Sequence, residues 1–364
     1  AGTGDVALNT ANDGTLAAKY FFCSTTTQTI GDLSAGGNLD QDKLVLKILV
    51  SAAMADSEKT FVSVKIGSDT AIVKPLSAFA VQSADTDTTA SKTGTTVIPV
   101  ILPMPQLTDD IVISIYTEGN ESEPLKSITY SAKQYIDGVI ALNGDNESLK
   151  NVLYALLNFG GYAQTFFGYN TDNLANADIK GTENDMVAGK SYSLTADNVK
   201  ATRSGTPNNA VFRGASLILD GEISLRFYLN LTNEKTPSDF TCKVGETEYE
   251  IQKDSNGFYV EIAHIGTAKL GDRIALEITE NGGSTVTYSC SPMTYVNTVK
   301  NMAEGTVKQE LKDVCDALFY YYHFASVYFG FDDATGSSLS DTAQLRVYTD
   351  PVNSYGALSD VTVA

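Results

Sequence analysis

Two long segments of the chain place apolar residues at the spacing of one buried helix face. Residues 149–169 and 311–331 repeat apolar side chains at intervals of three and four. These positions are Leu149, Val152, Leu153, Leu156, Leu157, Ala163 and Phe167, and then Leu311, Val314, Cys315, Leu318, Phe319, Ala325 and Phe329. Gly168 and Gly330 follow, where a left-handed C-cap is typical. The pattern predicts two amphipathic helices, each ending at a glycine.

The two predicted helices belong to a longer internal match. Each follows a shorter helical run, residues 132–142 in the first copy and roughly 293–302 in the second. Period-two, strand-like segments upstream also align: 44–50 with 223–229, 61–67 with 240–245, 111–116 with 274–279, and 127–130 with 284–288. We therefore expect an internal duplication in which one strand-rich module is written twice.

The alternation of short strands and turns predicts a β-rich α+β fold. We expect two tandem repeats, each a β-sandwich-like layer followed by a helical hairpin. Prolines at 99, 103 and 105 limit which strand can be central in the first copy. The expected divisions are residues 1–176 for the first module, 177–190 for a linker, 191–335 for the second module and 336–364 for a tail. Within the tail, Leu345–Tyr348 would either add an edge strand or remain partly ordered.

Composition narrows the function classes. The 364 residues carry a net charge of −19, which disfavours binding to nucleic acid or to anionic lipid. No stretch has the apolar length of a membrane span, so we expect no membrane insertion. Abundant Thr, Ser, Asn, Asp, Gly and Tyr with no Trp is typical of extracellular β-rich modules. We expect an extracellular or cell-wall location.

Nucleophilic catalysis finds little support in the sequence. The cysteines, Cys23, Cys242, Cys290 and Cys315, form no CxxC motif. A Cys242–Cys290 disulfide requires neighbouring strands, and buried free thiols are the alternative. The histidines are His264 and His323. Cys315 and His323 are eight residues apart on one helix, roughly 12 Å along its axis, so they form no dyad.

Acidic side chains are numerous, but no pair stands out as catalytic. Asp109-Asp110 and Asp332-Asp333 are expected to be solvated turn or cap residues. Two Asx-rich turns offer oxygen ligands for calcium: Asn143, Asp145, Asn146 and Glu147, and then Asn170, Asp172 and Asn173. Neither turn fits the DxDxDG calcium loop with its distal Glu. We expect no cofactor, with structural calcium as the weaker alternative.

Two strings resemble a family. The string from Leu156 to Ala175, which contains Phe167-Gly-Tyr-Asn-Thr-Asp-Asn-Leu-Ala175, resembles the helix end of a repeated module of secreted and cell-surface proteins of Gram-positive gut clostridia. Phe212–Leu229 is similar to the strand pair that opens such modules. The resemblance implies an extracellular accessory region with no assigned catalytic residues. The second copy departs from it, with Tyr320-Tyr-Tyr-His323 in place of Asn-Phe-Gly-Gly.

Where the two copies differ, the sequence offers a candidate ligand surface. Gly160-Gly161 lies mid-helix, where each glycine costs about 1 kcal/mol, so either another backbone approaches closely or a groove receives a ligand. The consecutive tyrosines pack against the sheets or form a contact surface for sugar or protein. The candidate residues are Gly160, Gly161, Tyr162, Tyr320, Tyr321, Tyr322 and His323.

These observations favour a non-enzymatic secreted or cell-surface module for adhesion, presentation or structural support. Its partner would be an extracellular protein or a glycan. One alternative is a carbohydrate-binding module that uses tyrosine platforms. A second is a hydrolase with an acidic residue pair.

Overall fold

The fold is described from a computed structural model of the chain. The residues that it describes are 6–7, 18–21, 45–51, 59–75, 78, 81–82, 95–120, 122–124, 126–142, 144–188, 193–194, 199–219, 223–263, 265–328 and 338–339. The predicted strand Leu345–Tyr348, Gly330 and Asp332-Asp333 lie outside these residues, as do Cys23, Asn143 and His264. The structure is α+β and rich in antiparallel sheet, as predicted.

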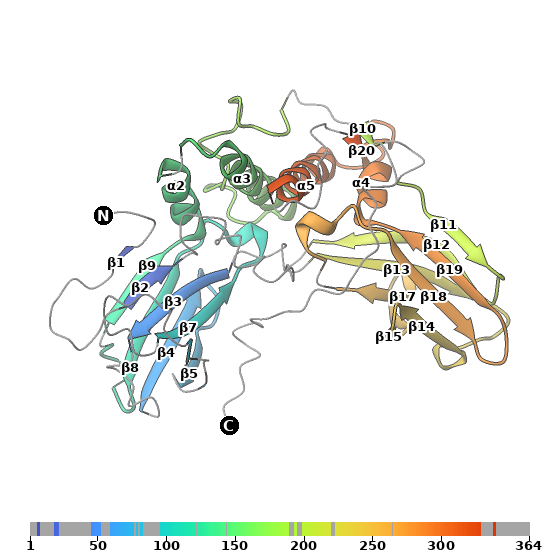
Figure 1. Cartoon of the computed structure of the whole chain (residues 1–364), viewed down its shortest axis with the longest axis horizontal. Helices are drawn as coiled ribbons and strands as arrows, with labels where there is room; N and C mark the ends of the chain where they lie inside the picture. The colour runs from blue at the N-terminus through green and yellow to red at the C-terminus, as the bar shows by residue number, and fades with distance from the viewer. Residues whose placement is uncertain are drawn as a thin grey trace.

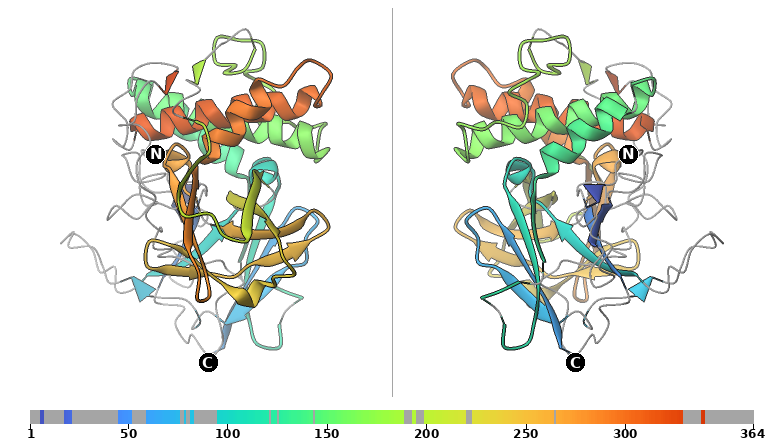
Figure 2. Two further views of the ribbon diagram at one scale, coloured as in Figure 1. Left: turned by 90° about the vertical axis from the view of Figure 1, so that its right-hand side faces the viewer. Right: turned by 90° about the vertical axis from the view of Figure 1, so that its left-hand side faces the viewer.

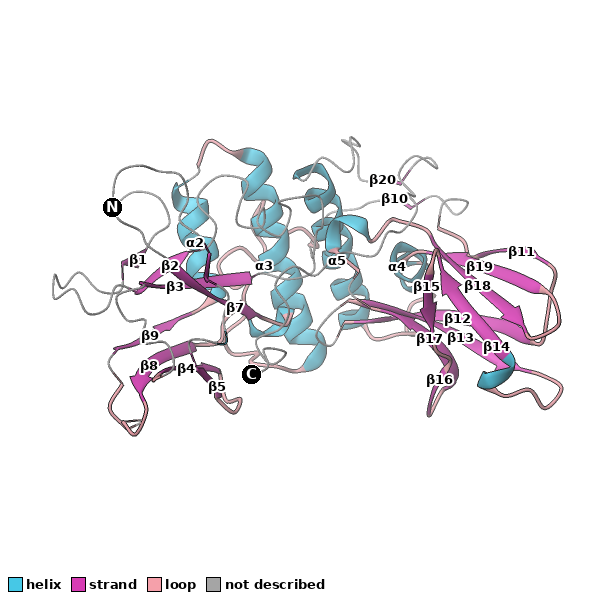
Figure 3. Cartoon of the chain, turned by 60° about the horizontal axis from the view of Figure 1, so that its bottom comes forward, coloured by secondary structure: helices cyan, strands magenta, loops and turns pink. Residues whose placement is uncertain are grey.

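The first half of the chain forms two antiparallel sheets in separate layers (Figures 1 and 3). One has the order β1-β2-β3-β7-β6, with β1 Val6–Ala7, β2 Ala18–Phe21, β3 Val45–Ser51, β6 Val81–Gln82 and β7 Thr95–Ile101. The other has the order β5-β4-β8-β9, with β4 Thr60–Ile66, β5 Ile72–Pro75, β8 Ile111–Thr117 and β9 Lys126–Tyr130. Pro99 lies in β7 beyond the residues that pair with β6, so its missing N–H interrupts no bond to that strand.

The second half forms a four-stranded and a five-stranded sheet. The four-stranded sheet has the order β12-β13-β17-β16, with β12 Ala210–Ile218, β13 Ser224–Leu231, β16 Gln252–Asp254 and β17 Gly257–Ile262. The five-stranded sheet has the order β11-β19-β18-β14-β15, with β11 Thr202–Gly205, β14 Phe240–Val244, β15 Thr247–Tyr249, β18 Ile274–Glu280 and β19 Thr285–Cys290. A short parallel pair joins β10 (Ser193–Leu194) to β20 (Ser338–Leu339).

A shared core holds these two sheets face to face. The ring of Phe212 on β12 stacks on that of Tyr288 on β19, with 5.3 Å between centroids. The Tyr288 hydroxyl donates to the carbonyl oxygen of Ala210 across the same gap. Alternate residues of β13, among them Leu225 and Phe227, are fully buried, so its other face points outward.

The helices follow the predicted pattern. α2 spans Ala132–Leu142, α3 Glu147–Phe167, α4 Pro292–Lys300 and α5 Gln309–Tyr328, and short 3-10 turns are η3 Met104–Gln106, η4 Pro237–Asp239 and η5 Thr267–Lys269. Asn146 caps the start of α3 by accepting from the Leu149 N–H. Gly168 ends α3 in the left-handed conformation with φ 65°, which confirms the predicted C-cap.

The long helices α3 and α5 lie side by side between the strand-rich halves (Figure 1), and α2 and α4 gather with them at one side of the molecule (Figure 2). The rings of Phe159 on α3 and Tyr321 on α5 stack with centroids 6.0 Å apart. The middle of α3 is therefore buried on more than its predicted apolar stripe, since Asn158, Phe159 and Gly160 are buried too, and this reflects packing on several sides. Phe167, which was predicted on the buried face, is 40% exposed at the end of the helix.

Matching positions of the two halves make matching contacts. The order β5-β4-β8-β9 is paralleled by β15-β14-β18-β19, and β2-β3-β7-β6 by β12-β13-β17-β16. At the start of α2 the Lys133 N–H donates to the Leu107 carbonyl oxygen, and at the start of α4 the Met293 N–H donates to that of Leu270. Each short helix is thus tied to the 3-10 turn that precedes β8 or β18.

Residues 168–188, which overlap the predicted linker, form a folded loop against α3. The Asn158 amide donates to the carbonyl oxygen of Asn184, and its oxygen accepts from the Met186 N–H. Gln164 likewise donates to the Asn173 carbonyl oxygen and accepts from the Ala175 N–H. Two buried amide side chains of the helix therefore bind the backbone of the loop.

Candidate functional site

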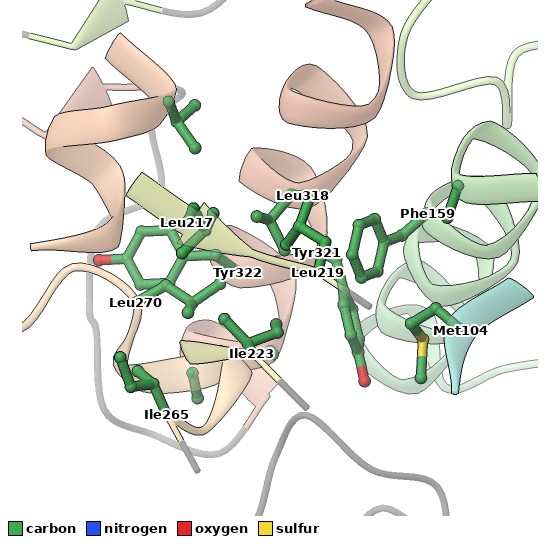
Figure 4. Close-up of a cluster of buried hydrophobic side chains, with 14 of the residues drawn as sticks. Met104, Phe159, Leu217, Leu219, Ile223, Ile265, Leu270, Leu318, Tyr321 and Tyr322 are labelled. Carbon is green, nitrogen blue, oxygen red and sulfur yellow. The ribbon is translucent and has the colours of Figure 1, made fainter. Parts of the chain in front are cut away.

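The residues predicted as a ligand surface lie inside the junction of α3 and α5. Tyr162 is 6% exposed, Tyr320 7%, Tyr321 2% and Tyr322 1%. Figure 4 shows Tyr321 between Phe159 and Ile223, and Tyr322 beside Leu270 and Leu217. His323 is partly exposed and stacks on Phe319 with the rings 7° from parallel. The tyrosine side chains are therefore packed within the molecule, and Tyr321 joins its two halves through Phe159.

Gly160 and Gly161 admit close neighbours. A Cβ atom on Gly160 would lie 2.5 Å from Cδ1 of Leu107, and one on Gly161 would lie 2.0 Å from Oδ1 of Asn176. The neighbours are side chains, whereas the sequence suggested a backbone. The space beside these glycines is filled by the protein itself.

A buried carboxylate holds the end of the loop. Asp185 accepts hydrogen bonds from the backbone N–H groups of Gly181, Val187 and Ala188, and from the Tyr162 hydroxyl. Burial raises the pKa of Asp185, but these donors outweigh it and hold the pKa below its ordinary value. Burial and the Asp185 charge raise the pKa of Tyr162. At neutral pH, Asp185 is therefore an ionised acceptor and Tyr162 is a neutral donor.

Asp109 was expected to be a solvated turn residue, and this is wrong. The residue is 6% exposed, and its carboxylate accepts from the Tyr169 hydroxyl and from the Asn170 amide. Burial raises the pKa of Asp109, hydrogen bonds from Tyr169 and Asn170 lower it, and the net pKa is raised. The side chain fastens the start of the loop to the turn before β8.

Three of the residues considered for calcium have structural partners. Asn146 caps α3, Glu147 pairs with Lys150 at 2.6 Å, and Asn170 donates to Asp109. Within the described ranges, no group of three His, Cys, Asp or Glu side chains is placed to hold a metal. In the same part of the chain, no helix is long and apolar enough to cross a membrane.

The cysteines that the structure describes are free and buried. Cys242 on β14 and Cys290 on β19 lie on opposite sides of β18, so their strands are not neighbours and the pair forms no disulfide. Burial raises the pKa of Cys242, Cys290 and Cys315 to about 12 in each case. These thiols are protonated at neutral pH and are poor nucleophiles.

A different group of polar and aromatic side chains gathers on the outer face of the β12-β13-β17-β16 sheet. We call it the Arg226 cluster, and its members are Ser224, Arg226, Tyr228, Gln252, Asp254, Tyr259 and Glu261. Nε of Arg226 donates to Glu261 at 2.8 Å, and its Nη1 donates to Asp254 at 3.3 Å. The guanidinium carbon lies 4.3 Å from the centroid of the Tyr259 ring.

The rest of the Arg226 cluster completes a connected network. The Tyr228 hydroxyl donates to Asp254 at 2.8 Å, and the Tyr259 hydroxyl donates to Gln252 at 3.0 Å. The ring centroids of Tyr228 and Tyr259 lie 5.7 Å apart. The Arg226 and Asp254 side chains keep 23% and 24% of their surface exposed, so a ligand can reach both.

The charge state of the cluster suits recognition more than proton transfer. Burial raises the pKa of Asp254, but hydrogen bonds from Tyr228 and from the backbone N–H groups of Asn256 and Gly257, with the Arg226 charge, leave it lowered. A carboxyl held ionised in this way is a poor general acid. Asp254 and Glu261 are therefore a carboxylate pair bridged by an arginine.

The matching sheet of the first half has other residue types at these positions. Arg226 is opposite Glu261 in the β13–β17 register, and Tyr228 is opposite Tyr259. The sequence match aligns Arg226 and Tyr228 with Lys47 and Leu49, which lie opposite Pro99 and Val97 in the β3–β7 register. Only the second half has an arginine, two tyrosines and a glutamate at this place.

Sequence reasoning did not find the Arg226 cluster. A signal was present, because Ser224, Arg226 and Tyr228 alternate with the apolar residues of β13. The partners on β16 and β17 could be assigned only from the strand register.

Comparison of the chain with protein-family models, with curated proteins and with solved structures finds no match.

Proposed function

We propose that the chain is a non-enzymatic, secreted or cell-surface module for adhesion or presentation, in which the Arg226 cluster is the recognition surface. The proposal includes an internal duplication, two copies of one sandwich-and-hairpin module. The parallel strand orders and the paired bonds Lys133–Leu107 and Met293–Leu270 support the duplication. The resemblance to surface modules of gut clostridia supports the location.

The helix junction supports a structural role for most of the shared features. Aromatic side chains of this junction pack α3 against α5, and the buried ring of Phe159 stacks on that of Tyr321. Such a junction joins the two sandwiches through buried surface. This arrangement suits a module that acts as a spacer and presents a binding face.

The observation that carries the proposal is the difference between the copies at equivalent register positions. A scaffold needs apolar residues on the inner face of β13, and both copies have them in sequence. The outer face is free to vary, and there the second copy has charged and aromatic residues in one network. Conservation of the core with divergence of an exposed face is what a specialised binding copy requires.

A second candidate function, carbohydrate binding, is favoured by the chemistry of the same cluster. Aromatic rings stack on the apolar faces of sugars, while carboxylate, guanidinium and amide groups hydrogen-bond sugar hydroxyls. Tyr228 and Gln252 provide both kinds of group beside Asp254. The tyrosine platform proposed from sequence would thus be Tyr228 on β13 in place of α5, because Tyr259 beside it is only 7% exposed.

The test is a binding screen of the purified chain on a glycan array and on a panel of extracellular matrix proteins. We expect binding that Arg226→Gln abolishes, and that Arg203→Gln, on the exposed strand β11, leaves unchanged. Thermal unfolding of each variant shows that it is folded. No binding on either surface, or equal binding by Arg226→Gln, contradicts the proposal.

Two further measurements address the non-enzymatic character and the location. Incubation with chromogenic glycosides, esters and peptides should give no turnover, and turnover that a point substitution removes would contradict the proposal. An antibody to the chain should label intact cells of the source organism, and labelling only after lysis would exclude a surface location.

A further inference from the structure

Two residues at the same position of the two long helices meet where the helices join. The sequence match sets Leu149 opposite Leu311, an offset of 162 residues (311 minus 149), and the same offset sets Phe159 opposite Tyr321. These are the residues whose buried rings stack, with their centroids 6.0 Å apart. In an interface between two equivalent bodies, a residue that contacts its own counterpart lies beside a two-fold axis. The junction thus has the geometry of a symmetric dimer within one chain.

The direction of the helices agrees with this axis. α3 and α5 cross each other (Figure 2). Burial, Asp185 and the charge of Asp313 on α5 all raise the pKa of Tyr162 on α3. Tyr162 follows Phe159 along α3, whereas Asp313 precedes Tyr321 along α5. The later turns of one helix therefore lie near the earlier turns of the other, as a two-fold axis requires and a simple translation of one half does not.

Each long helix is also fixed to its own half at an equivalent position. The Gln164 side chain of α3 donates to the Thr108 hydroxyl at 3.0 Å, just after η3. The Ser326 hydroxyl of α5, at the same offset from Gln164, donates to the Ala268 carbonyl oxygen in η5 at 2.8 Å. Both hydrogen bonds are buried. Each helix is therefore held by its own half, and the two halves present their helix faces in the same way.

The surface around the stacked rings is apolar on both sides. Leu156 on α3 and Leu318 on α5 occupy equivalent positions one turn before the rings, and both are buried. Met104 and Ile223 lie on either side of the stacked pair (Figure 4). Surfaces of this kind associate through apolar burial. Because equivalent patches already fit each other here, the partner that each face selects is another copy of the same patch.

We infer that the face of each long helix is a self-complementary docking surface whose partner is a second copy of the same module. In the intact chain the other half is that partner. When one of the two faces is disabled, the free face binds the same face of a second copy of the chain. This inference rests on the internal duplication included in the proposed function, and it does not depend on any ligand of the Arg226 cluster.

The experiment uses the full chain with one face disabled by a charge, since an unpaired charge is excluded from an apolar interface. Phe159→Asp disables the α3 face and leaves the α5 face free, and Tyr321→Asp does the reverse. We expect each variant alone to form a concentration-dependent dimer in analytical ultracentrifugation. The double variant should be monomeric. Phe167→Asp, at an exposed position of α3, should be monomeric like the wild type.

An equimolar mixture of Phe159→Asp and Tyr321→Asp is the positive control, because it forms the α3–α5 junction between two chains whatever the symmetry of that junction. Each variant alone should dimerise with a dissociation constant within about a hundredfold of that of the mixture. Circular dichroism shows whether each variant is folded, and Phe159→Ala and Tyr321→Ala replace any aspartate variant that is not. Adding Arg226→Gln should leave the association unchanged, which separates this inference from the proposed recognition surface.

Monomeric single variants beside a dimeric mixture would overturn the inference, because the two faces would then be complementary to each other without being complementary to themselves. Dimers of the double variant, or aggregates of the single variants without a fixed stoichiometry, would overturn it as well. Absence of association in the single variants and in the mixture would have the same meaning.

Discussion

The rings of Phe159 and Tyr321 stack with their centroids 6.0 Å apart, and this contact joins α3 of the first half to α5 of the second. Phe159 is 1% exposed and Tyr321 is 2% exposed. The two residues are far apart in sequence and belong to corresponding helices. Their contact therefore links the stability of one half to that of the other.

Phe159→Ala should destabilise the chain by about 3–5 kcal/mol, since it leaves a cavity at the junction. The halves should also uncouple, so urea unfolding would separate into two transitions. Tyrosine fluorescence can follow this, because the chain contains no Trp. Phe167→Ala, at a position 40% exposed on the same helix, is the control and should cost no more than about 1 kcal/mol. Equal losses in the two variants would refute the role of the stacked pair.

Gly161→Ala should destabilise the chain by about 1–3 kcal/mol, although alanine favours helix by about 1 kcal/mol. The new Cβ would collide with the Asn176 side chain. Gly138→Ala, in α2 with no atom within 4 Å of its Cβ position, should instead stabilise. Denaturant titration gives both values. Adding Asn176→Ala to Gly161→Ala should recover part of the loss, and failure to do so would exclude the collision as the cause.

Asp109→Asn should become more stable relative to the wild type as pH rises from 3 to 7. Burial raises the folded-state pKa of Asp109 above its ordinary value of 3.8. The wild-type protein binds this proton more tightly when folded, so the associated stability is present at low pH and is lost as pH rises through the raised pKa. Free energies of unfolding at several pH values measure the trend. Asp110→Asn, at the exposed neighbour, is the control, and the same trend there would contradict the assignment.

Asp185→Asn should show the opposite trend. The folded-state pKa of Asp185 is lowered, because the N–H groups of Gly181, Val187 and Ala188 together with Tyr162 outweigh burial. Its ionised form stabilises the fold above the ordinary pKa of 3.8, and this contribution is lost as pH falls through the folded-state pKa. The variant should therefore have a lower free energy of unfolding than the wild type at pH 7, and this difference should shrink as the pH falls. Asp172→Asn, on the exposed part of the same loop, should show no such gap.

Local pattern predicted the helices well, and the reason is visible in α2. Its observed bounds, Ala132–Leu142, equal those expected from the apolar period, and Gly168 caps α3 as its backbone freedom predicts. These features depend on residues within a few positions of one another. The candidate site could not be found in this way, because Arg226 meets Glu261 and Asp254 only after three strands have paired.

The sequence by itself determined the β-rich α+β class, the places of the helices and of the strands that align between the two halves, and the residue types repeated along the chain. Hydrophobic periodicity is sufficient for this, since it reports which side of each element avoids water. Only the tertiary structure decided what each buried side faces. Tyr320–Tyr322 suggested a contact surface because a helix with aromatic residues all round exposes some of them when alone. Here Phe159 of a second helix stacks on Tyr321, and Leu217 and Leu270 lie beside Tyr322. The polar surface that stays exposed depends on strand register.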